Sequence, residues 1–247
     1  MITVETIRER RSVREYDGKP LSRAEFDALG AVVEEFVCES GLDIQLVGDN
    51  PEVFNVIARF GLIRGCRTHI AFVVDDAKAG DVAANGATEA EMRGARRTAA
   101  DEAIGYWGQR IVLAAQDMGL NTCWCALCSR KKSCAVVAPG KKIRLIIAVG
   151  HGKTQGFSRK TKSVEALSSV ECAKAPAWFA AAMEAAQLAP TAMNNQNFKI
   201  TLLSDGKTVR IDAPQSGLNV IDEGIVRCNF EIAANEAGAD WRWERGI

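Results

Sequence analysis

Two short segments rich in apolar residues constrain the fold of this chain most strongly. The first extends from Thr68 to Val74 and the second from Ile143 to Val149. Each has the length of a β-strand, and neither alternates between apolar and polar residues as a strand with one solvated face does. The sequence therefore predicts two central strands, of which the 68–74 strand is buried on both faces.

Helical and alternating patterns surround these two runs. Ser22 and Glu25 form a capping-box signature for a helix whose apolar residues recur through Phe36. The segment 42–46 alternates as a strand does, and residues 81–97 read as a surface loop that passes into a helix. The other predicted helices span residues 5–11, 53–60, 103–118, 177–189 and 222–237, and residues 164–170 are predicted as a short helix or a turn. Residues 122–127 are predicted as a strand or an extended segment, and 198–203 and 209–211 as the two strands of a hairpin.

Composition argues against several classes of function. The chain has 247 residues, enough for one large domain or two small ones. Its 31 Lys plus Arg residues balance 31 Asp plus Glu residues, so bulk charge does not support nucleic-acid or membrane-surface binding. No apolar run reaches the roughly 18 residues of a membrane-spanning helix, and charges occupy the positions where a signal peptide is apolar. We expect a cytoplasmic protein with no nucleic-acid or membrane partner.

The eight cysteines raise the question of a metal site or a disulfide scaffold. Zinc usually takes two separated ligand pairs, whereas four of these cysteines lie in one short segment, at Cys123, Cys125, Cys128 and Cys134. We therefore expect no metal there, and no disulfide scaffold in a chain without a secretion signal. The remaining four are expected to be small core residues: Cys38, Cys66, Cys172 and Cys228.

The stretch from Met183 to Leu203 combines a helix, an abrupt stop and a strand. Pro190 ends the helix, because proline lacks the amide that the helical hydrogen-bond ladder needs. Thr191 and four amide side chains then follow in one short turn, at Asn194, Asn195, Gln196 and Asn197. Such a turn can present hydrogen-bonding groups to a ligand, or it can be a connection that only caps and turns. These residues alone leave both interpretations open.

The segment Arg10–Arg14 is the most concentrated charged feature. Its arginines and the Ser12 hydroxyl can hold a phosphate, since guanidinium groups bind phosphate oxygens bidentately. The alternative is a solvated basic turn paired with Glu9 and Glu15, and these residues alone favour it. A second basic cluster can join the first around one phosphate or face solvent, and consists of Arg159, Lys160 and Lys162.

Other catalytic motifs are not found. Gly152-Lys153-Thr154 follows a strand as the end of a nucleotide-binding P-loop does, but Ile147 stands where that motif needs its first glycine. His69 lies in a buried strand, and His151 has no Ser/Asp partner pattern. A hydrolytic triad is therefore not expected.

Two helical segments resemble each other. Residues 105–119 and 224–238 share their first and last glycines and an alanine pair, Ala114-Ala115 in one and Ala233-Ala234 in the other. This match indicates that a unit of the first part is repeated in the second, although alanine-rich helices also resemble one another by composition alone.

Taken together, five segments resemble the FMN-dependent nitroreductase family. Arg10–Arg14 resembles its phosphate-binding signature R-[RH]-S-x-[RK]. Gly65–Phe72 resembles its G-A-P-x-x-I strand entry, with Arg67 in place of the proline. Ala114–Trp124 resembles A-A-x-x-L-G-L-G-T-C-W, with Asn121 at the second glycine. Residues 159–165 resemble the basic phosphate clamp, and 189–198 resemble A-P-S-x-x-N-x-Q-P-W.

The last of these segments is displaced along the chain. In ordinary family members it lies near the N-terminal arginine segment and contributes to the partner subunit's flavin site. Its place near residue 190 is most similar to the subfamily with two half-like repeats in one chain. The resemblance implies an α+β nitroreductase-like fold with a central, mostly antiparallel sheet flanked by helices. It also implies an internal pseudo-dimer, with a half at 1–163, a shorter repeat at 164–247, and a monomeric protein, a homodimer being the alternative.

FMN is the cofactor that the resemblance implies. Its phosphate would be bound by Arg10, Arg11, Ser12 and Arg14 together with Arg159 or Lys162. The pyrimidine edge of its ring needs both donors and acceptors, which the amides of the motif supply. The motif residues are Pro190, Thr191, Asn194 and Gln196.

The same resemblance implies contacts at the reactive end of the ring and a reaction. Backbone amides near Cys125 and Ala126 would approach the flavin N5, and Arg14 or Arg64 would place positive charge near the reduced ring. NADH or NADPH would be the donor, and a small nitroaromatic, quinone or similar electrophile the acceptor, in a ping-pong cycle with no catalytic side chain. The alternatives are a non-catalytic protein that stores or senses flavin, and a homologue that binds none.

Overall fold

The structure is a computed structural model that describes residues 2–54, 63–75, 89–126, 128–171, 174–215 and 217–244. The chain divides into two units. The large-sheet unit comprises Arg10–Ala100 and Ile111–Ser158, and the small-sheet unit comprises Met1–Glu9, Asp101–Arg110 and Arg159–Ile247. The predicted repeat halves, 1–163 and 164–247, stay a prediction.

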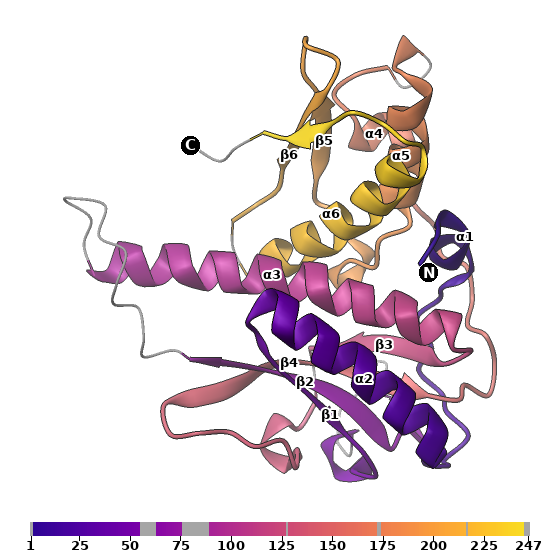
Figure 1. Ribbon diagram of the computed structural model, residues 1–247, viewed down its shortest axis with the longest axis vertical. Helices are drawn as coiled ribbons and strands as arrows, with labels where there is room; N and C mark the ends of the chain where they lie inside the picture. Colours follow the sequence, from indigo (N-terminus) through magenta and orange to yellow (C-terminus); the bar gives the residue numbers. More distant parts are fainter. Residues whose placement is uncertain are drawn as a thin grey trace. The chain divides into compact units, whose positions relative to one another are not determined.

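The two apolar runs form the inner strands of the large-sheet unit (Figure 1). Four antiparallel strands lie in the order β1 (Asp43–Val47), β2 (Thr68–Asp75), β4 (Lys141–Gly150) and β3 (Asn121–Cys125). Ile70 pairs with Ile147 in the middle of β2 and β4, and both side chains are fully buried. The prediction of two central strands is confirmed, because strands without a polar face need a neighbour on each edge and cover on each side.

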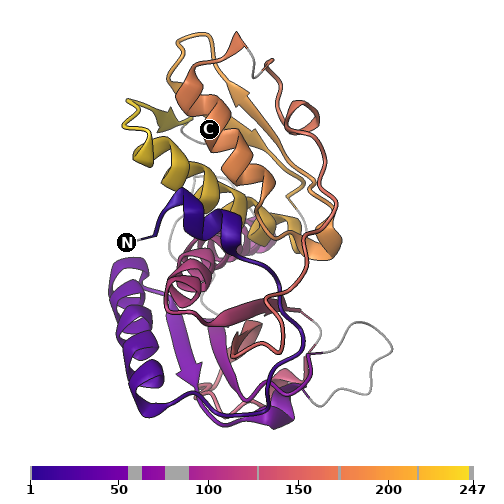
Figure 2. The same ribbon diagram turned by 90° about the vertical axis from the view of Figure 1, so that its right-hand side faces the viewer.

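Helix α2 (Arg23–Ser40) covers one face of this sheet (Figures 1 and 2). The predicted capping box is present: the Glu25 amide donates to Ser22 Oγ at 3.3 Å, and the Ser22 amide donates to Glu25 Oε2 at 2.8 Å. The helix buries Leu29, Val33 and Phe36 at helical spacing. A 3-10 helix, Pro51–Phe54, starts where a helix over 53–60 was predicted, and the rest of that prediction lies outside the described residues.

The small-sheet unit pairs two helices with a second sheet. Helix α5 (Ala177–Gln187) packs beside α6 (Asn219–Glu236), next to the hairpin of β5 (Lys199–Leu202) and β6 (Thr208–Asp212) (Figure 2). The hairpin was predicted, but the short parallel strand β7 (Arg242–Trp243) was not. Its tryptophan packs against Phe230, with ring centroids 5.1 Å apart. The short helices α1 (Val4–Glu9) and α4 (Val164–Leu167) complete this unit.

Helix α3 (Glu89–Asp117) supplies residues 101–110 to the small-sheet unit, where they cross α6. A Cβ atom on Gly105 would overlap the carbonyl oxygen of Ile221, and one on Gly224 would overlap that of Glu102. Each glycine thus faces the carbonyl of the residue three positions before the other glycine. These are the first glycines of the two matched segments, so the crossing is reciprocal, as in a contact related by a two-fold axis.

Several element ends differ from the predictions. Helix α1 ends at Glu9, so Arg10 and Arg11 lie beyond the helix in which they were expected. Helix α6 begins at Asn219, three residues before the predicted start. Among the described helices, none is long and apolar enough to cross a membrane.

Candidate functional site

The basic segment, Arg10–Arg14, lies extended beside β3 in the large-sheet unit. The Val13 amide donates to the Thr122 carbonyl at 3.0 Å, and Ser12 forms a β-bridge with Thr122. The Arg64 amide donates to the Arg14 carbonyl at 2.8 Å. Backbone pairing therefore brings Arg64 next to Arg14, the two residues that the resemblance offers as alternative cations near the reduced ring.

The cations of this segment differ in their surroundings. Arg10 is 4% exposed, and its Nη1 donates to Ser12 Oγ at 3.4 Å. Arg11 is half-buried and its Nη1 donates to the Arg10 carbonyl at 3.0 Å. The side chains of Arg14 and Arg64 are exposed. A buried guanidinium beside a hydroxyl, with two exposed cations that backbone pairing brings together, is a donor set suited to an anion.

Glycines in the 150–156 loop let the basic segment approach closely. A Cβ on Gly156 would lie 2.8 Å from the Cβ of Arg11, and one on Gly152 would lie 2.7 Å from Val13 Cγ1. Asn121, which replaces a glycine of the family pattern, fixes the same loop: its Oδ1 accepts from the Gly152 amide and its Nδ2 donates to Gln155 Oε1, both at 2.9 Å. The departure at Asn121 thus has a structural role.

Cys125 and Ala126 lie at the end of β3, three and four residues beyond the bridge to Ser12. Cys125 is 7% exposed, and the Ala126 carbonyl accepts from Arg130 Nη2 at 2.9 Å. The large-sheet unit therefore contains seven of the predicted site residues: Arg10, Arg11, Ser12, Arg14, Arg64, Cys125 and Ala126.

The amide turn, Thr191–Asn197, belongs to the small-sheet unit and has an unusual backbone. Met193, Asn194 and Gln196 adopt positive φ angles of 53°, 56° and 47°. Such angles cost non-glycine residues roughly 1 kcal/mol or more each, and they persist only where surrounding contacts hold them. Three such φ angles within the four residues 193–196 mark the turn as a candidate ligand site.

Gln196 and Lys162 hold the turn in place. Gln196 Oε1 accepts from the Lys162 amide at 2.7 Å, and its Nε2 donates to the Gln187 carbonyl at 2.9 Å. Lys162 Nζ donates to the Gln196 carbonyl at 2.9 Å. The backbone amide of Gln196 also donates to Thr191 Oγ1 at 3.0 Å. Both ends of the Gln196 side chain thus have protein partners.

Asn194 leaves one buried acceptor open. Its Nδ2 donates to the Lys160 carbonyl at 2.7 Å, which orients the amide. Its Oδ1 is buried and has no hydrogen-bond partner among the described residues. A buried carbonyl oxygen without a donor is costly, which favours a ligand N–H at this position.

Asp222 was not predicted as a site residue, yet it anchors the amide turn from the first turn of α6. Its two oxygens accept from the Ala192 amide at 2.9 and 3.0 Å. Burial raises the pKa of Asp222 to about 6, against the lowering effects of the Ala192 amide and the Arg159 guanidinium. An acidic residue in a first helical turn is common, so no sequence signal could have distinguished this one.

Arg159 makes a further contact just before the amide turn. It is half-buried, and its Nη2 donates to the Ala189 carbonyl at 3.2 Å, next to the buried Pro190. The small-sheet unit therefore contains the other six predicted site residues: Arg159, Lys162, Pro190, Thr191, Asn194 and Gln196. Hydrogen bonds join four of them: Lys162 to Gln196, and Gln196 and Asn194 to Thr191.

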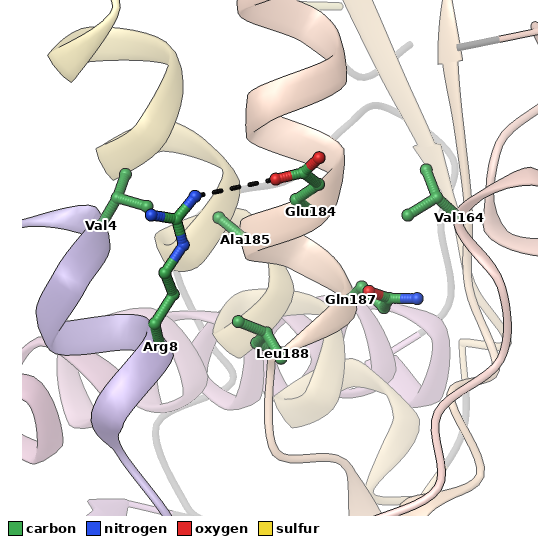
Figure 3. A pocket seen from close by; sticks show the side chains of 7 residues that line it. All are labelled: Val4, Arg8, Val164, Glu184, Ala185, Gln187 and Leu188. Carbon is green, nitrogen blue, oxygen red and sulfur yellow. Dashed lines mark ion pairs between the residues drawn. The ribbon is translucent and has the colours of Figure 1, made fainter. Parts of the chain in front are cut away.

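A pocket of about 320 Å³ lies elsewhere in the small-sheet unit (Figure 3). Arg8 of α1 and Glu184 of α5 face each other across it at 3.8 Å. Both side chains are more than half exposed, and such pairs contribute little. Gln187, whose Nε2 donates to the Lys162 carbonyl at 2.7 Å, connects the pocket wall to the amide turn.

The two histidines differ from each other. His69 is fully buried; its Nε2 pairs with Ser133 Oγ at 2.8 Å, and burial lowers its pKa to about 4. Its Nδ1 has no partner in the described part of the chain. His69 is thus buried in its strand as predicted, with a hydrogen bond at one ring nitrogen. His151 lies 3.0 Å from Glu25 at the surface.

The cysteine expectations are met in part. Cys66 and Cys228 are core residues, as expected, whereas Cys38 is exposed on α2 and that expectation is wrong; Cys172 lies outside the described residues. Within the described ranges, no three side chains of His, Cys, Asp or Glu gather as metal ligands do. The expectation of no metal stays a prediction.

Comparison with solved structures shows the class of fold. A solved structure of a putative nitroreductase from Thermotoga maritima superposes with a TM-score of 0.63 over 96% of this chain and 85% of that chain, at 21% identity. This likeness shows a nitroreductase fold, in agreement with the predicted α+β architecture.

Two further structures match a smaller share of the chain. A nitroreductase family protein from Streptococcus pneumoniae matches 68% of this chain and 98% of that chain, at 16% identity and a TM-score of 0.49. A putative nitroreductase in complex with FMN, from Desulfovibrio desulfuricans, matches 68% and 95% respectively, at 20% identity and a TM-score of 0.47. A search of curated proteins found no match.

The sequence itself matches one family model. The family described as "Putative TM nitroreductase" matches residues 2–86 and 90–234. The chain therefore belongs to this nitroreductase family.

Proposed function

We propose that this chain is an FMN-dependent oxidoreductase that takes electrons from NADH or NADPH and reduces a small electrophile. Family membership supports an oxidoreductase of nitroreductase type. The observation that carries the cofactor proposal is the amide turn, with its strained backbone and the buried, unpaired Oδ1 of Asn194. A flavin pyrimidine ring carries an N–H donor that such an acceptor can bind.

The phosphate of FMN is assigned to the basic residues. Arg10 and Ser12 supply a guanidinium and a hydroxyl that are already hydrogen-bonded to each other, and Arg11 and Arg14 add charge in the same extended segment. Charge-assisted hydrogen bonds to a phosphate are about twice as strong as neutral ones. Arg159 or Lys162 completes the set, although both already donate to carbonyls near the amide turn.

The ring is assigned to the motif residues, with different roles for the two amides. Asn194 offers a free acceptor, whereas both ends of the Gln196 side chain already have protein partners. Gln196 therefore positions the turn, and Asn194 contacts the ring. Pro190 and Thr191 lie just beyond the end of α5 at Gln187. The Thr191 hydroxyl anchors the turn by accepting from the Gln196 backbone amide, and Arg159 donates to the Ala189 carbonyl next to Pro190.

The residues at the reactive end bind and orient. Backbone amides at Cys125 and Ala126 are assigned to the N5 end, and Arg14 or Arg64 supplies positive charge that stabilises a reduced, anionic ring. When bound, FMN supplies hydride transfer to and from small molecules. No side-chain acid or base is assigned to the reaction.

The fold proposal is a pseudo-dimer in a single chain. The reciprocal contacts of Gly105 and Gly224 support it, because the two matched segments meet as symmetry-related helices would. On this proposal the chain supplies both the basic segment and the amide turn, and it acts as a monomer.

Flavin binding and turnover test the function separately. Freshly purified protein, or protein reconstituted with FMN, should show flavin absorbance and oxidise NADH or NADPH in the presence of a nitroaromatic or a quinone. Flavin binding with no oxidation in a broad acceptor panel would favour storage or sensing instead. A colourless protein that cannot be reconstituted would defeat the cofactor proposal.

A further inference from the structure

Two cysteines of the large-sheet unit stand in direct contact where β3 ends. Cys125 is the last residue of the strand, and Cys128 follows three positions later, a C-x-x-C spacing. Each thiol shifts the pKa of the other, upward for Cys125 and downward for Cys128. The Cys128 sulfur also lies 3.5 Å from the Cys125 carbonyl oxygen. Dithiols at this spacing can close into a disulfide with little backbone movement.

The surroundings make the two sulfurs unequal. Cys125 is 7% exposed and lies in the apolar cluster with Cys66 and Cys123. Its hydrogen bond to Cys128, with burial, raises its pKa, so it stays a protonated donor. Cys128 is partly exposed, and the hydrogen bond from Cys125 lowers its pKa, assisted by Arg130. Cys128 is thus the thiol that can act as a nucleophile, whereas Cys125 stays protonated.

A hydrogen bond holds the side chain of Arg130, whose positive charge helps to lower the pKa of Cys128. Its Nη2 donates at 2.9 Å to the carbonyl of Ala126, the residue that follows Cys125. It opens a basic 3-10 helix, Arg130–Lys132, whose two lysines are exposed. Positive charge next to a partly exposed thiol is the setting in which cysteines react.

We propose that Cys125 and Cys128 are a redox-active dithiol that reduces disulfides by thiol–disulfide exchange. The Cys128 thiolate attacks one sulfur of a substrate disulfide, which forms a mixed disulfide and releases the first thiolate. The Cys125 thiol then loses its proton to that leaving group or to water and attacks the Cys128 sulfur, which releases the second thiolate. The two substrate sulfurs gain two electrons, and the chain gains a Cys125–Cys128 disulfide.

The other described cysteines do not have this arrangement. The Cys66 sulfur lies 3.2 Å and 3.4 Å from the carbonyl oxygens of Thr68 and Val149, and burial raises its pKa to about 12. Cys123 and Cys228 are buried. Cys38 and Cys134 are exposed and therefore serve as internal controls for simple accessibility.

Incubation of the full-length protein with glutathione disulfide, followed by alkylation and peptide mapping by mass spectrometry, tests the proposal. The wild-type chain should lose two free thiols and carry a Cys125–Cys128 bond that dithiothreitol reverses. Cys125→Ser should stop at glutathione attached to Cys128. Cys128→Ser should leave Cys125 unmodified, and Cys134→Ser should behave as wild type.

The wild-type result alone can overturn the proposal, so it does not depend on the folding of a variant. Glutathione on Cys38 or Cys134, with both Cys125 and Cys128 still open to alkylation in denaturant, would show that accessibility and not the paired site governs reaction. The readout is independent of flavin, so failure of the dithiol and failure of the flavin proposal are distinguishable.

Discussion

At the scale of single residues, the carboxyl of Asp222 holds the amide turn, and its burial lowers the free energy of unfolding where it is ionised. A rise of its pKa from 3.8 to about 6 means that the folded chain binds a proton more tightly than the unfolded chain. Between about pH 4 and pH 6 the free energy of unfolding should therefore fall as pH rises, by up to about 3 kcal/mol from this group.

Asp222→Asn should remove this dependence. The amide keeps an acceptor for the Ala192 N–H but cannot ionise, so urea unfolding of the variant should show a smaller loss of stability between pH 4.5 and pH 7. Asp212→Asn, an exposed carboxyl on β6, is the control and should keep the wild-type slope. An unchanged slope in the Asp222 variant would contradict the burial penalty.

Asn194 carries a second prediction at this scale. Asn194→Gly tolerates the φ of 56° and removes the buried acceptor. The Kd for FMN should rise about tenfold, which corresponds to about 1.4 kcal/mol for one lost hydrogen bond. Titration with FMN fluorescence measures it. Asn195→Gly, at an exposed neighbour with φ of −72°, should leave the Kd within about twofold, and equal Kd values for both variants would exclude the assigned contact.

The candidate residues were partly accessible from the sequence. Arginines next to a serine and amides after a proline are visible as types of chemistry, so both groups could be named. That Gln196 has two protein partners while Asn194 has an open acceptor depends on which carbonyls approach them in space. Asp222 could not be named, because its partner is the backbone of a distant turn.

At the scale of elements, the crossing of α3 and α6 depends on two glycines. Gly105→Ala or Gly224→Ala would place a methyl group against a backbone carbonyl of the other helix, which cannot rotate away. Each variant should lose about 3 kcal/mol of unfolding free energy or more, measured by urea denaturation. Gly30→Ala in α2 is the matched control, since its Cβ would meet only Leu46 Cδ2 at 4.0 Å. It should gain up to about 1 kcal/mol.

Elements with strong local patterns were predictable, and elements fixed by tertiary packing were not. The apolar runs of β2 and β4, the capping box of α2 and the hairpin of β5 and β6 all appear where the sequence placed them. Strand β7 has two residues and gains its place from β6 and from the packing of Trp243 against Phe230. No two-residue pattern can predict that.

At the scale of the whole molecule, the proposed pseudo-dimer makes a prediction about which chain supplies each part of the site. If one chain supplies both the basic segment and the amide turn, a variant defective in either part cannot be rescued by a second copy. If two copies share each site, as in an ordinary family dimer, they can complement each other. The two outcomes differ in the amount of FMN bound by a mixture.

Arg10→Ala with Arg14→Ala in one preparation, and Asn194→Gly in another, provide the test. The first removes the phosphate contacts and the second the ring contact, so each alone should bind FMN weakly. Mixed after co-refolding and titrated with FMN, the pair should bind no better than the sum of the separate variants. Tight binding at about a quarter of the sites or more would show that the site is assembled between two copies, because random pairing of defective chains restores intact sites only in mixed dimers.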